Sequence, residues 1–202
     1  MSELFDPTAN VAVTGGGLAV YLLFLLAFVI ALFRGAKGRN EGEAAAKTSA
    51  VSRLGIFVQM LAFFWTGFGP IRLTLRGIDT QMIGEVLMIG AICIASLMIF
   101  TRARTALAEN WSFVARTRSD HQLVQTGPYR FVRHPIYLCL MLSLIAMALA
   151  MGHPQRLFIG LPVHIAGTLI RVREEERLLR AMFGAAFDAY AAKVKRFVPG
   201  LL

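Results

Sequence analysis

The sequence has few charged residues and few cysteines, and both shortages limit the classes of protein to which it can belong. Charged residues make up only 16% of the 202 residues, whereas hydrophobic residues make up 56% and the mean hydropathy is +0.61. This composition indicates an integral membrane protein. The two cysteines, Cys93 and Cys139, both lie inside apolar runs. A disulfide framework is therefore not expected, and neither is a metal site.

Acidic residues are also scarce, at 12 against 21 Lys and Arg, which gives a net charge of +9. Such a charge is typical of nucleic-acid-binding proteins, but here the basic residues adjoin apolar runs and no nucleic-acid motif is present. Membrane topology explains them better, and no nucleic-acid partner is expected. The residues before the first apolar run include Glu3 and Asp6 and no basic residue. That run is therefore predicted to be a retained span and not a cleaved signal peptide.

Long apolar runs are what the sequence has in abundance. The first covers residues 15–33, and 19 residues of helix are about 28 Å long, which is enough to cross the hydrocarbon core. Further spans are predicted at 51–69, 82–100, 136–151 and 157–170. The last two are short and are separated by only five residues, which predicts an antiparallel helical hairpin.

The basic residues are distributed unevenly between the two sides of these spans. Residues 34–53, 101–135 and the tail from 171 carry 18 of the 21 Lys and Arg, and the other connections carry only Arg72, Arg76 and Arg156. The positive-inside rule then predicts five transmembrane helices, with the N-terminus outside and the C-terminus in the cytosol. The predicted fold class is all-α integral membrane, in one membrane-embedded domain over residues 1–202.

One polar stretch, residues 121–137 with the sequence HQLVQTGPYRFVRHPIY, lies between two of these spans. Gly127 and Pro128 form a turn signal, and Pro135 is suited to the first position of the helix that follows. The positive end of that helix would face the polar stretch and is suited to a carboxylate or a phosphate. The stretch supplies side chains for a small, partly anionic ligand that contains an aromatic ring, namely His121, Tyr129, Arg130, Arg133, His134 and Tyr137. The same residues could instead anchor the helix at the lipid headgroups.

Two polar residues inside the spans favour structural roles. Glu85 lies one turn into its span, at the end away from the polar stretch, and is expected to snorkel or to form hydrogen bonds. His164 follows Pro162 by two residues and is expected to be a hydrogen-bonded histidine beside a kink, although a ligand contact is the alternative.

The tail continues the helix of the fifth span and ends in a short amphipathic segment. Arg171 and Glu175 are four residues apart and share a helix face, unless the charged run is simply solvated. Gly184 is predicted to interrupt the helix. Beyond it one apolar face, which could lie on the membrane surface or cover a cofactor, is formed by Phe187, Tyr190, Ala191 and Val194.

Two motifs in this half of the chain resemble those of a known family. HxLVxxGPYxxxRHPxY at 121–137, a hydrophobic hairpin, and REEERLLRAMFGAAFDAY at 173–190 followed by Val194, Arg196 and Pro199 resemble the isoprenylcysteine carboxyl methyltransferases and the wider phospholipid methyltransferases. The resemblance covers about residues 110–200. Residues 101–202 would then be the catalytic half, whereas the three N-terminal spans in residues 1–100 match the family only as hydrophobic helices.

The resemblance also implies a cofactor and site residues. The cofactor would be S-adenosylmethionine, in a pocket on the cytosolic face formed by the loop before the fourth span and the C-terminal helices. Glu175 would be the acidic cofactor contact, Arg171 the substrate-facing arginine, and Arg133 the motif arginine beside the cofactor. The remaining cofactor-binding residues would be His121, Gln122, Leu123, Val124, Tyr129, His134, Pro135, Ile136 and Tyr137.

The predicted function is methyl transfer to a lipophilic acceptor that reaches the site from the bilayer, and the carboxylate of a prenylated cysteine is the first choice because Arg171 is present. The alternatives are methylation of a phospholipid amine or another small lipid-like acceptor, an NADPH-dependent enzyme of the sterol-reductase type, and a non-enzymatic protein that binds membrane lipid. A carboxylate acceptor is ionised at pH 7 and needs no general base, whereas an amine or a thiol would need a proton acceptor such as His121 or His134.

Overall fold

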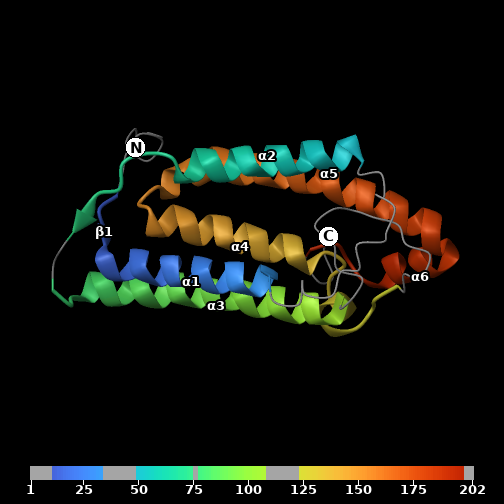
Figure 1. Cartoon of the computed structure of the whole chain (residues 1–202), viewed down its shortest axis with the longest axis horizontal. Coiled ribbons are helices and arrows are strands. Elements are labelled where there is room, and N and C mark those ends of the chain that lie inside the picture. The colour runs from blue at the N-terminus through green and yellow to red at the C-terminus, as the bar shows by residue number, and fades with distance from the viewer. Residues whose placement is uncertain (1–10, 34–48, 75–76, 108–122, 198–202) are drawn as a thin grey trace.

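The computed structural model describes residues 11–33, 49–74, 77–107 and 123–197, and most of these residues are helical. Five long helices run side by side: α1 (Gly15–Phe33), α2 (Ala50–Gly67), α3 (Thr80–Leu107), α4 (Pro135–Ala150) and α5 (Leu157–Phe183). In Figure 1, α1 lies along α3, α2 lies along α5, and α4 runs between the two pairs. The short helix α6 (Ala185–Lys193) follows α5 at one end of the bundle.

Three of these helices are long and apolar enough to cross a membrane, namely α1, α2 and α3, while α4 is a shorter apolar helix. Their outward faces carry the large apolar side chains: Leu23, Phe64 and Leu87 are 66%, 65% and 66% exposed. Apolar surface on this scale is typical of contact with lipid. The helical membrane class is thereby supported.

The interior of the bundle is divided between two interfaces of different character. Between α1, α3 and α4 a hydrophobic core forms around Tyr21, Phe24, Ile89 and Leu144, all nearly or fully buried. The α2–α5 interface is instead lined by small and polar residues. A side chain on Gly167 would lie only 2.9 Å from the Gly55 carbonyl oxygen. Close backbone approach of this kind is how helices associate inside membranes.

The last two predicted spans are consecutive helices, as expected. A short connection over residues 151–156, which includes the 3-10 turn η4 (Pro154–Arg156), joins α4 to α5. The main packing partner of α5, however, is α2 and not α4. Gly55, Gly160 and Gly167 allow this closer contact, and α4 packs chiefly against α3.

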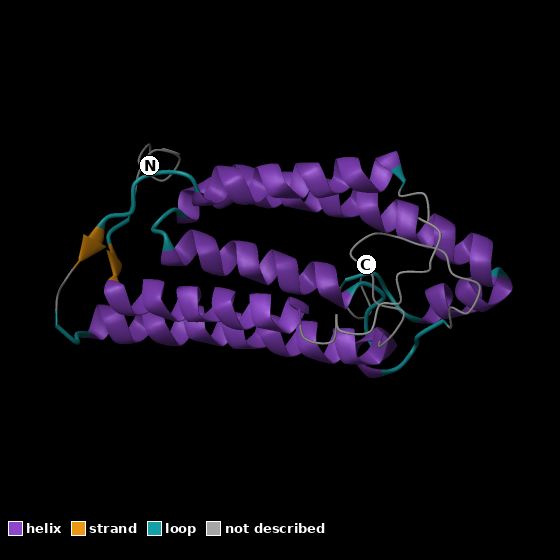
Figure 2. Cartoon of the chain, in the orientation of Figure 1, coloured by secondary structure: helices purple, strands orange, loops and turns teal. Residues whose placement is uncertain are grey.

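Two short strands, orange in Figure 2, lie at the end of the bundle where α1 begins. Strand β1 (Val13–Thr14) pairs in parallel with β2 (Leu73–Thr74). Glu85 lies here, and its carboxylate accepts hydrogen bonds from the Thr14 hydroxyl at 2.7 Å and the Gln81 amide at 2.8 Å. The predicted hydrogen-bonded role of Glu85 is confirmed.

His164 differs from the prediction. It is 1% exposed, and neither ring nitrogen has a hydrogen-bond partner among the described residues. Its ring instead meets the edge of Phe63, with ring centroids 5.7 Å apart. The expectation of a hydrogen-bonded histidine is therefore wrong for this part of the chain, because the neighbouring helix faces place an aromatic ring beside the imidazole.

Candidate functional site

The loop before α4 has the local structure that its sequence predicts. Gly127 has a φ of 59°, a left-handed conformation that glycine adopts without strain, and it opens the 3-10 turn η3 (Gly127–Arg130). Pro135 occupies the first position of α4, and His134 is the residue before it. Within the described part of the chain, the N-cap residue His134 makes no side-chain capping hydrogen bond. The turn therefore delivers Arg133 and His134 to the N-terminal end of α4.

The C-terminal segment holds this loop in place through backbone contacts. Val132 and Lys195 form a parallel β-bridge. The amide of Arg133 donates to the Lys195 carbonyl at 2.7 Å, and the amide of His134 donates to the Arg196 carbonyl at 3.0 Å. We call residues 194–197 the C-terminal strap. It places its own arginine, Arg196, beside the loop.

Three cations converge on Glu176, which is 4% exposed. The Arg133 guanidinium lies 3.0 Å from its carboxylate, the Arg196 guanidinium 2.7 Å, and His134 Nε2 3.2 Å. Arg133 also donates to the carbonyl oxygens of Ala191 and Val194. Arg133 thus joins the loop to α5, α6 and the strap. Its contacts are those of a residue that holds the site together.

Glu175, the neighbouring acid, faces a different group of side chains. Its carboxylate accepts a hydrogen bond from the Tyr137 hydroxyl and lies 3.6 Å from His134 Nδ1 and 3.7 Å from the Arg171 guanidinium. Its side chain is 24% exposed, against 5% for Glu176. Of the two, Glu175 is the carboxylate that a ligand can reach.

The charges within this group shift the pKa values of its members. Burial would lower the pKa of His134, but hydrogen bonds to Glu175 and Glu176 raise it above its ordinary value. Burial would likewise raise the pKa of both carboxyls, but the hydrogen bonds and charges of His134 and the neighbouring arginines lower it. All of these shifts favour the ionised forms, with carboxylates at Glu175 and Glu176 and an imidazolium at His134.

Arg171 lies one helical turn before Glu175 on α5. Its guanidinium is 5.2 Å from the centre of the Tyr137 ring, and it donates to the side-chain amide oxygen Oε1 of Gln59 on α2 across 3.5 Å. The side chain is 13% exposed. A positive and a negative group, Arg171 and Glu175, thus stand side by side one helical turn apart.

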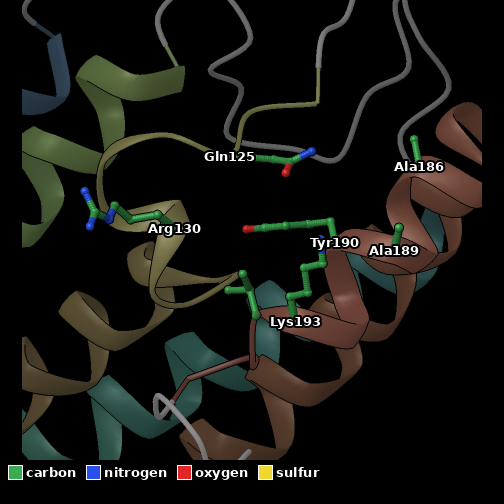
Figure 3. Close-up of a pocket in the computed structure, with 7 residues that line it drawn as sticks. Gln125, Arg130, Ala186, Ala189, Tyr190 and Lys193 are labelled. Carbon is green, nitrogen blue, oxygen red and sulfur yellow. The ribbon is translucent and has the colours of Figure 1, made fainter.

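A hollow of about 580 Å³ opens between the loop and α6. Figure 3 shows Arg130 and Gln125 on the loop side and Tyr190 and Lys193 on the α6 side. The Tyr190 hydroxyl donates to the Tyr129 carbonyl at 2.6 Å, which ties the two walls together. The remaining lining residues are Ala186, Ala189 and Val194.

Most of the residues predicted from the motifs lie in or beside this cluster. Glu175 contacts His134, Tyr137 and Arg171, and Tyr129 is buried, at 7% exposed. The half-buried or buried neighbours along the loop and the start of α4 are Leu123, Val124, Pro135 and Ile136. His121 and Gln122 lie outside the described residues.

Three residues to which the sequence analysis gave no role in the site belong to the same cluster, namely Gln59, Glu176 and Arg196. Glu176 follows Glu175 directly, and a helix turns about 100° per residue, so consecutive acids face different neighbours. Glu174 accordingly points elsewhere and pairs with Arg177 at 2.8 Å. Gln59 carried a usable signal, because a polar amide within an apolar span is a functional candidate by default.

These features define a class: a helical membrane protein with a cluster of ionised side chains at one end of its bundle, built from the fourth and fifth long helices and the tail. The profile of the family described as phospholipid methyltransferase matches residues 80–186, which is about half of the chain. The protein belongs to the phospholipid methyltransferase family.

Two curated proteins are similar to this chain. Protein-S-isoprenylcysteine O-methyltransferase of Saccharomyces cerevisiae (strain ATCC 204508 / S288c) is 34% identical over 101 residues, which are 49% of this chain and 42% of that protein. An uncharacterized protein of Haemophilus influenzae (strain ATCC 51907 / DSM 11121 / KW20 / Rd) is 27% identical over 106 residues, or 52% of this chain and 59% of that protein. The chain thus spans about half the length of each relative.

Proposed function

We propose that the protein is an S-adenosylmethionine-dependent membrane methyltransferase whose acceptor is the carboxylate of a lipophilic molecule, with a prenylated cysteine as the first candidate. The observation that carries the proposal is the pair Arg171 and Glu175, 3.7 Å apart at the site end of α5. Family membership and the similarity to the yeast isoprenylcysteine enzyme support the class of reaction.

The side chains of the cluster fit this methyl donor. S-adenosylmethionine carries an ammonium and ribose hydroxyls, which a partly exposed carboxylate such as Glu175 can bind. It also carries a carboxylate, which suits the uncapped N-terminal end of α4 beside His134. When bound, the donor supplies an activated methyl group. The residues for the cofactor would be those around Glu175, with Tyr129, His134 and Tyr137 among them.

The task left to the protein is to bind and align the acceptor. A carboxylate is ionised at pH 7, so no side chain has to remove a proton. Arg171 has a permanent charge and a planar group that can pair with both carboxylate oxygens. Holding two reactants in line in this way can lower a barrier by roughly 7–11 kcal/mol. Arg171 is thus the proposed substrate-binding residue, and Arg133 holds the surrounding structure.

The alternative acceptor is a phospholipid amine, which the description of the family favours. An ammonium headgroup must lose a proton before it can accept a methyl group. The histidine nearest the site is poorly suited to accept this proton, because Glu175 and Glu176 raise the pKa of His134 and so favour its protonated form. Arg171 would also repel a cationic headgroup. Both points favour the carboxylate acceptor.

The topology belongs to the same proposal. Five crossings would place the start of α1 outside, and the C-terminal strap and the charged cluster on the cytosolic face. The arrangement in Figure 1 is compatible with this, because the end of α3, the start of α4 and the tail all lie at one end of the bundle. A lipophilic acceptor would then reach the site from the bilayer.

Calorimetric titration of the detergent-purified protein tests which cofactor it binds. S-adenosylhomocysteine is expected to bind, and Glu175→Gln is expected to weaken this binding by about tenfold or more, because a hydrogen bond to a charged group is lost. The matched control is Glu174→Gln, one residue earlier on α5, which faces Arg177 and should leave binding unchanged. NADPH is titrated in parallel. Binding of NADPH alone would support the reductase alternative, and binding of neither would favour a non-enzymatic lipid-binding protein.

The acceptor is tested with two lipophilic compounds and a donor labelled in its methyl group. N-acetyl-S-farnesylcysteine presents a carboxylate, and a phospholipid with a primary amine headgroup presents an amine. A methyl ester is released by mild base, whereas an N-methyl group is not. Base-labile label in the prenylated compound supports the proposal, and base-stable label in the phospholipid would replace the carboxylate acceptor by the amine.

A further inference from the structure

A glutamine in the middle of α2 bridges two residues of α5. Gln59 is 5% exposed, and its Nε2 donates to the Thr168 hydroxyl oxygen at 2.8 Å. Its Oε1 accepts from the Arg171 guanidinium at 3.5 Å, which is near the outer limit for such a bond. A buried amide is costly unless both ends have partners. Both ends of Gln59 have one, and they lie one turn apart on the same helix.

The chemistry of the partners fixes which way the amide points. A guanidinium only donates hydrogen bonds, so the carbonyl oxygen of Gln59 must face Arg171. The amide nitrogen must then face Thr168, whose hydroxyl oxygen can accept. Thr168 is itself buried, at 6% exposed. The Thr168 contact therefore holds the Gln59 oxygen toward Arg171.

The stem of Arg171 is also in contact with α2. Gly55 lies one turn before Gln59, and a side chain there would come within 2.4 Å of Arg171 Cγ. The Tyr137 ring covers the guanidinium from the side of α4, at 5.2 Å. A long, flexible side chain is thus confined by α2 at its stem, by α4 over its face and by an amide oxygen at its tip.

We infer that Gln59 is a positioning residue for Arg171, with Thr168 as its support, and that α2 thereby contributes to selection of a carboxylate-bearing acceptor. The inference rests on the proposed function. It concerns a helix outside residues 80–186, which are the ones that match the family. The neutral amide is suited to this task because it orients the guanidinium without cancelling its charge. A carboxylate in the same place would orient Arg171 equally well and would compete with the acceptor.

The test compares Gln59→Leu, Gln59→Glu and a matched control in KM and kcat for N-acetyl-S-farnesylcysteine. The control is Thr66→Val, a similarly shaped change at a fully buried position on the same helix face, at the opposite end from Arg171. Gln59→Leu is expected to raise KM about tenfold, since the Arg171 guanidinium is no longer oriented. Gln59→Glu is expected to raise KM at least as much. The Kd for S-adenosylhomocysteine should stay at the wild-type value in all three variants.

A second measurement does not depend on turnover. Phenylglyoxal modifies accessible arginines, and mass spectrometry follows Arg171 with Arg180, which is 52% exposed, as an internal reference. Modification of Arg171 relative to Arg180 is expected to be several-fold faster in Gln59→Leu, and to stay at the wild-type rate in Gln59→Glu and Thr66→Val. Thr168→Val, which removes the support of the amide, should show a smaller increase, and Thr168→Ser should restore the wild-type rate.

The outcomes separate the inference from the proposed function. If the wild type methylates the probe and Gln59→Leu keeps the wild-type KM and Arg171 modification rate, the positioning role is wrong. If Gln59→Leu fails to fold, wild-type values in Thr168→Val would equally show that the positioning role is wrong. If the wild type does not methylate the probe, the carboxylate acceptor is wrong, and the modification rates alone decide whether Gln59 positions Arg171.

Discussion

His134 Nε2 lies 3.2 Å from Glu176 Oε1, and the other ring nitrogen of the same imidazole lies 3.6 Å from Glu175 Oε2. A neutral imidazole has one donor and one acceptor nitrogen, so it would turn a lone pair toward one of the two carboxylates. The imidazolium donates at both nitrogens. The geometry therefore agrees with the raised pKa of His134, and one protonated ring joins the two acids.

The pH dependence of stability follows from these shifts. The pKa of His134 is raised above 6.5, so its contribution is complete below pH 6.5 and is lost as pH rises through the raised value. The carboxyl pKa values of Glu175 and Glu176 are lowered below 4.5, so their contribution is complete above pH 4.5 and is lost as pH falls through the lowered values. The Tm of the purified protein should therefore be highest between these limits.

The control for the alkaline side is His134→Gln. This variant should have a lower Tm near neutral pH and should lack the decline that His134 causes above pH 6.5. Tyr190 does not interfere, because burial raises its pKa to about 12. A wild-type Tm that stays constant through the alkaline range, in parallel with the variant, would show that His134 is neutral in the folded protein.

Glu176→Gln is expected to be strongly destabilising. The change leaves Arg133, Arg196 and His134 clustered without their shared carboxylate, and removal of one partner of a buried pair typically costs about 3–5 kcal/mol. Asp188→Asn is the comparison, because its pair with Arg180 is more than half exposed and should contribute at most about 1 kcal/mol. Thermal unfolding in detergent measures the loss of stability in both variants. Equal losses would mean that the Glu176 cluster contributes little to the stability of the protein.

Arg171→Ala should separate binding of the donor from use of the acceptor. The Arg171 guanidinium is proposed to bind the acceptor carboxylate, so turnover of N-acetyl-S-farnesylcysteine should fall by about two orders of magnitude, comparable to loss of a charged hydrogen bond. Arg171→Lys should restore only part of the rate, because an ammonium cannot form two parallel bonds. Calorimetry should find S-adenosylhomocysteine binding within a few-fold of the wild type. If Arg171→Ala methylated every acceptor at the wild-type rate, Arg171 would not be the residue that binds the acceptor carboxylate.

Gly167→Ala should weaken the α2–α5 interface. The added methyl group would lie 2.9 Å from backbone atoms of Gly55 and Gln59, so the two helices would have to separate. A loss of about 1–3 kcal/mol is typical of such overpacking. Gly84→Ala is the matched control, since nothing lies within 4 Å of a side chain there. Because alanine is a better helix former than glycine, Gly84→Ala should leave the stability unchanged or raise it slightly. The measurement is the Tm of both variants, and a Gly167→Ala Tm equal to that of Gly84→Ala would contradict the prediction.

The orientation can be tested by labelling introduced cysteines in intact cells with a membrane-impermeant maleimide. Ile78 is 82% exposed and lies in the connection predicted to be outside, whereas Gln125 is in the loop predicted to be cytosolic. Ile78→Cys should react directly, and Gln125→Cys only after permeabilisation. The native Cys93 and Cys139 are 3% and 0% exposed and should give little background. The reverse pattern would invert the proposed topology.

The sequence predicted those parts of the site that depend on local signals. The turn at Gly127, the helix start at Pro135 and the break at Gly184 depend on the backbone preferences of single residues, and all three are confirmed. The pairing of Arg171 with Glu175 depends on helical periodicity alone, and it too is confirmed.

Contacts between distant segments were beyond such reasoning. The motif placed Arg133 beside the cofactor, but its partners Glu176 and Val194 are 43 and 61 residues away, and no local pattern identifies them. Gln59 and Arg171 are 112 residues apart. Whether α5 would pack on α2 or on α4 depended on where the glycines of two helices meet, which is a property of the assembled interface.

The bridge between Val132 and Lys195 makes the site depend on residues that are synthesised after the helices. Glu176 has its full set of cations only when Arg196 is present, and Arg196 emerges from the ribosome after all five long helices have been made. Until then the membrane would hold an inserted bundle with an incomplete charge cluster. A chain without the strap would leave the amides of Arg133 and His134 without their backbone partners and Glu176 without Arg196.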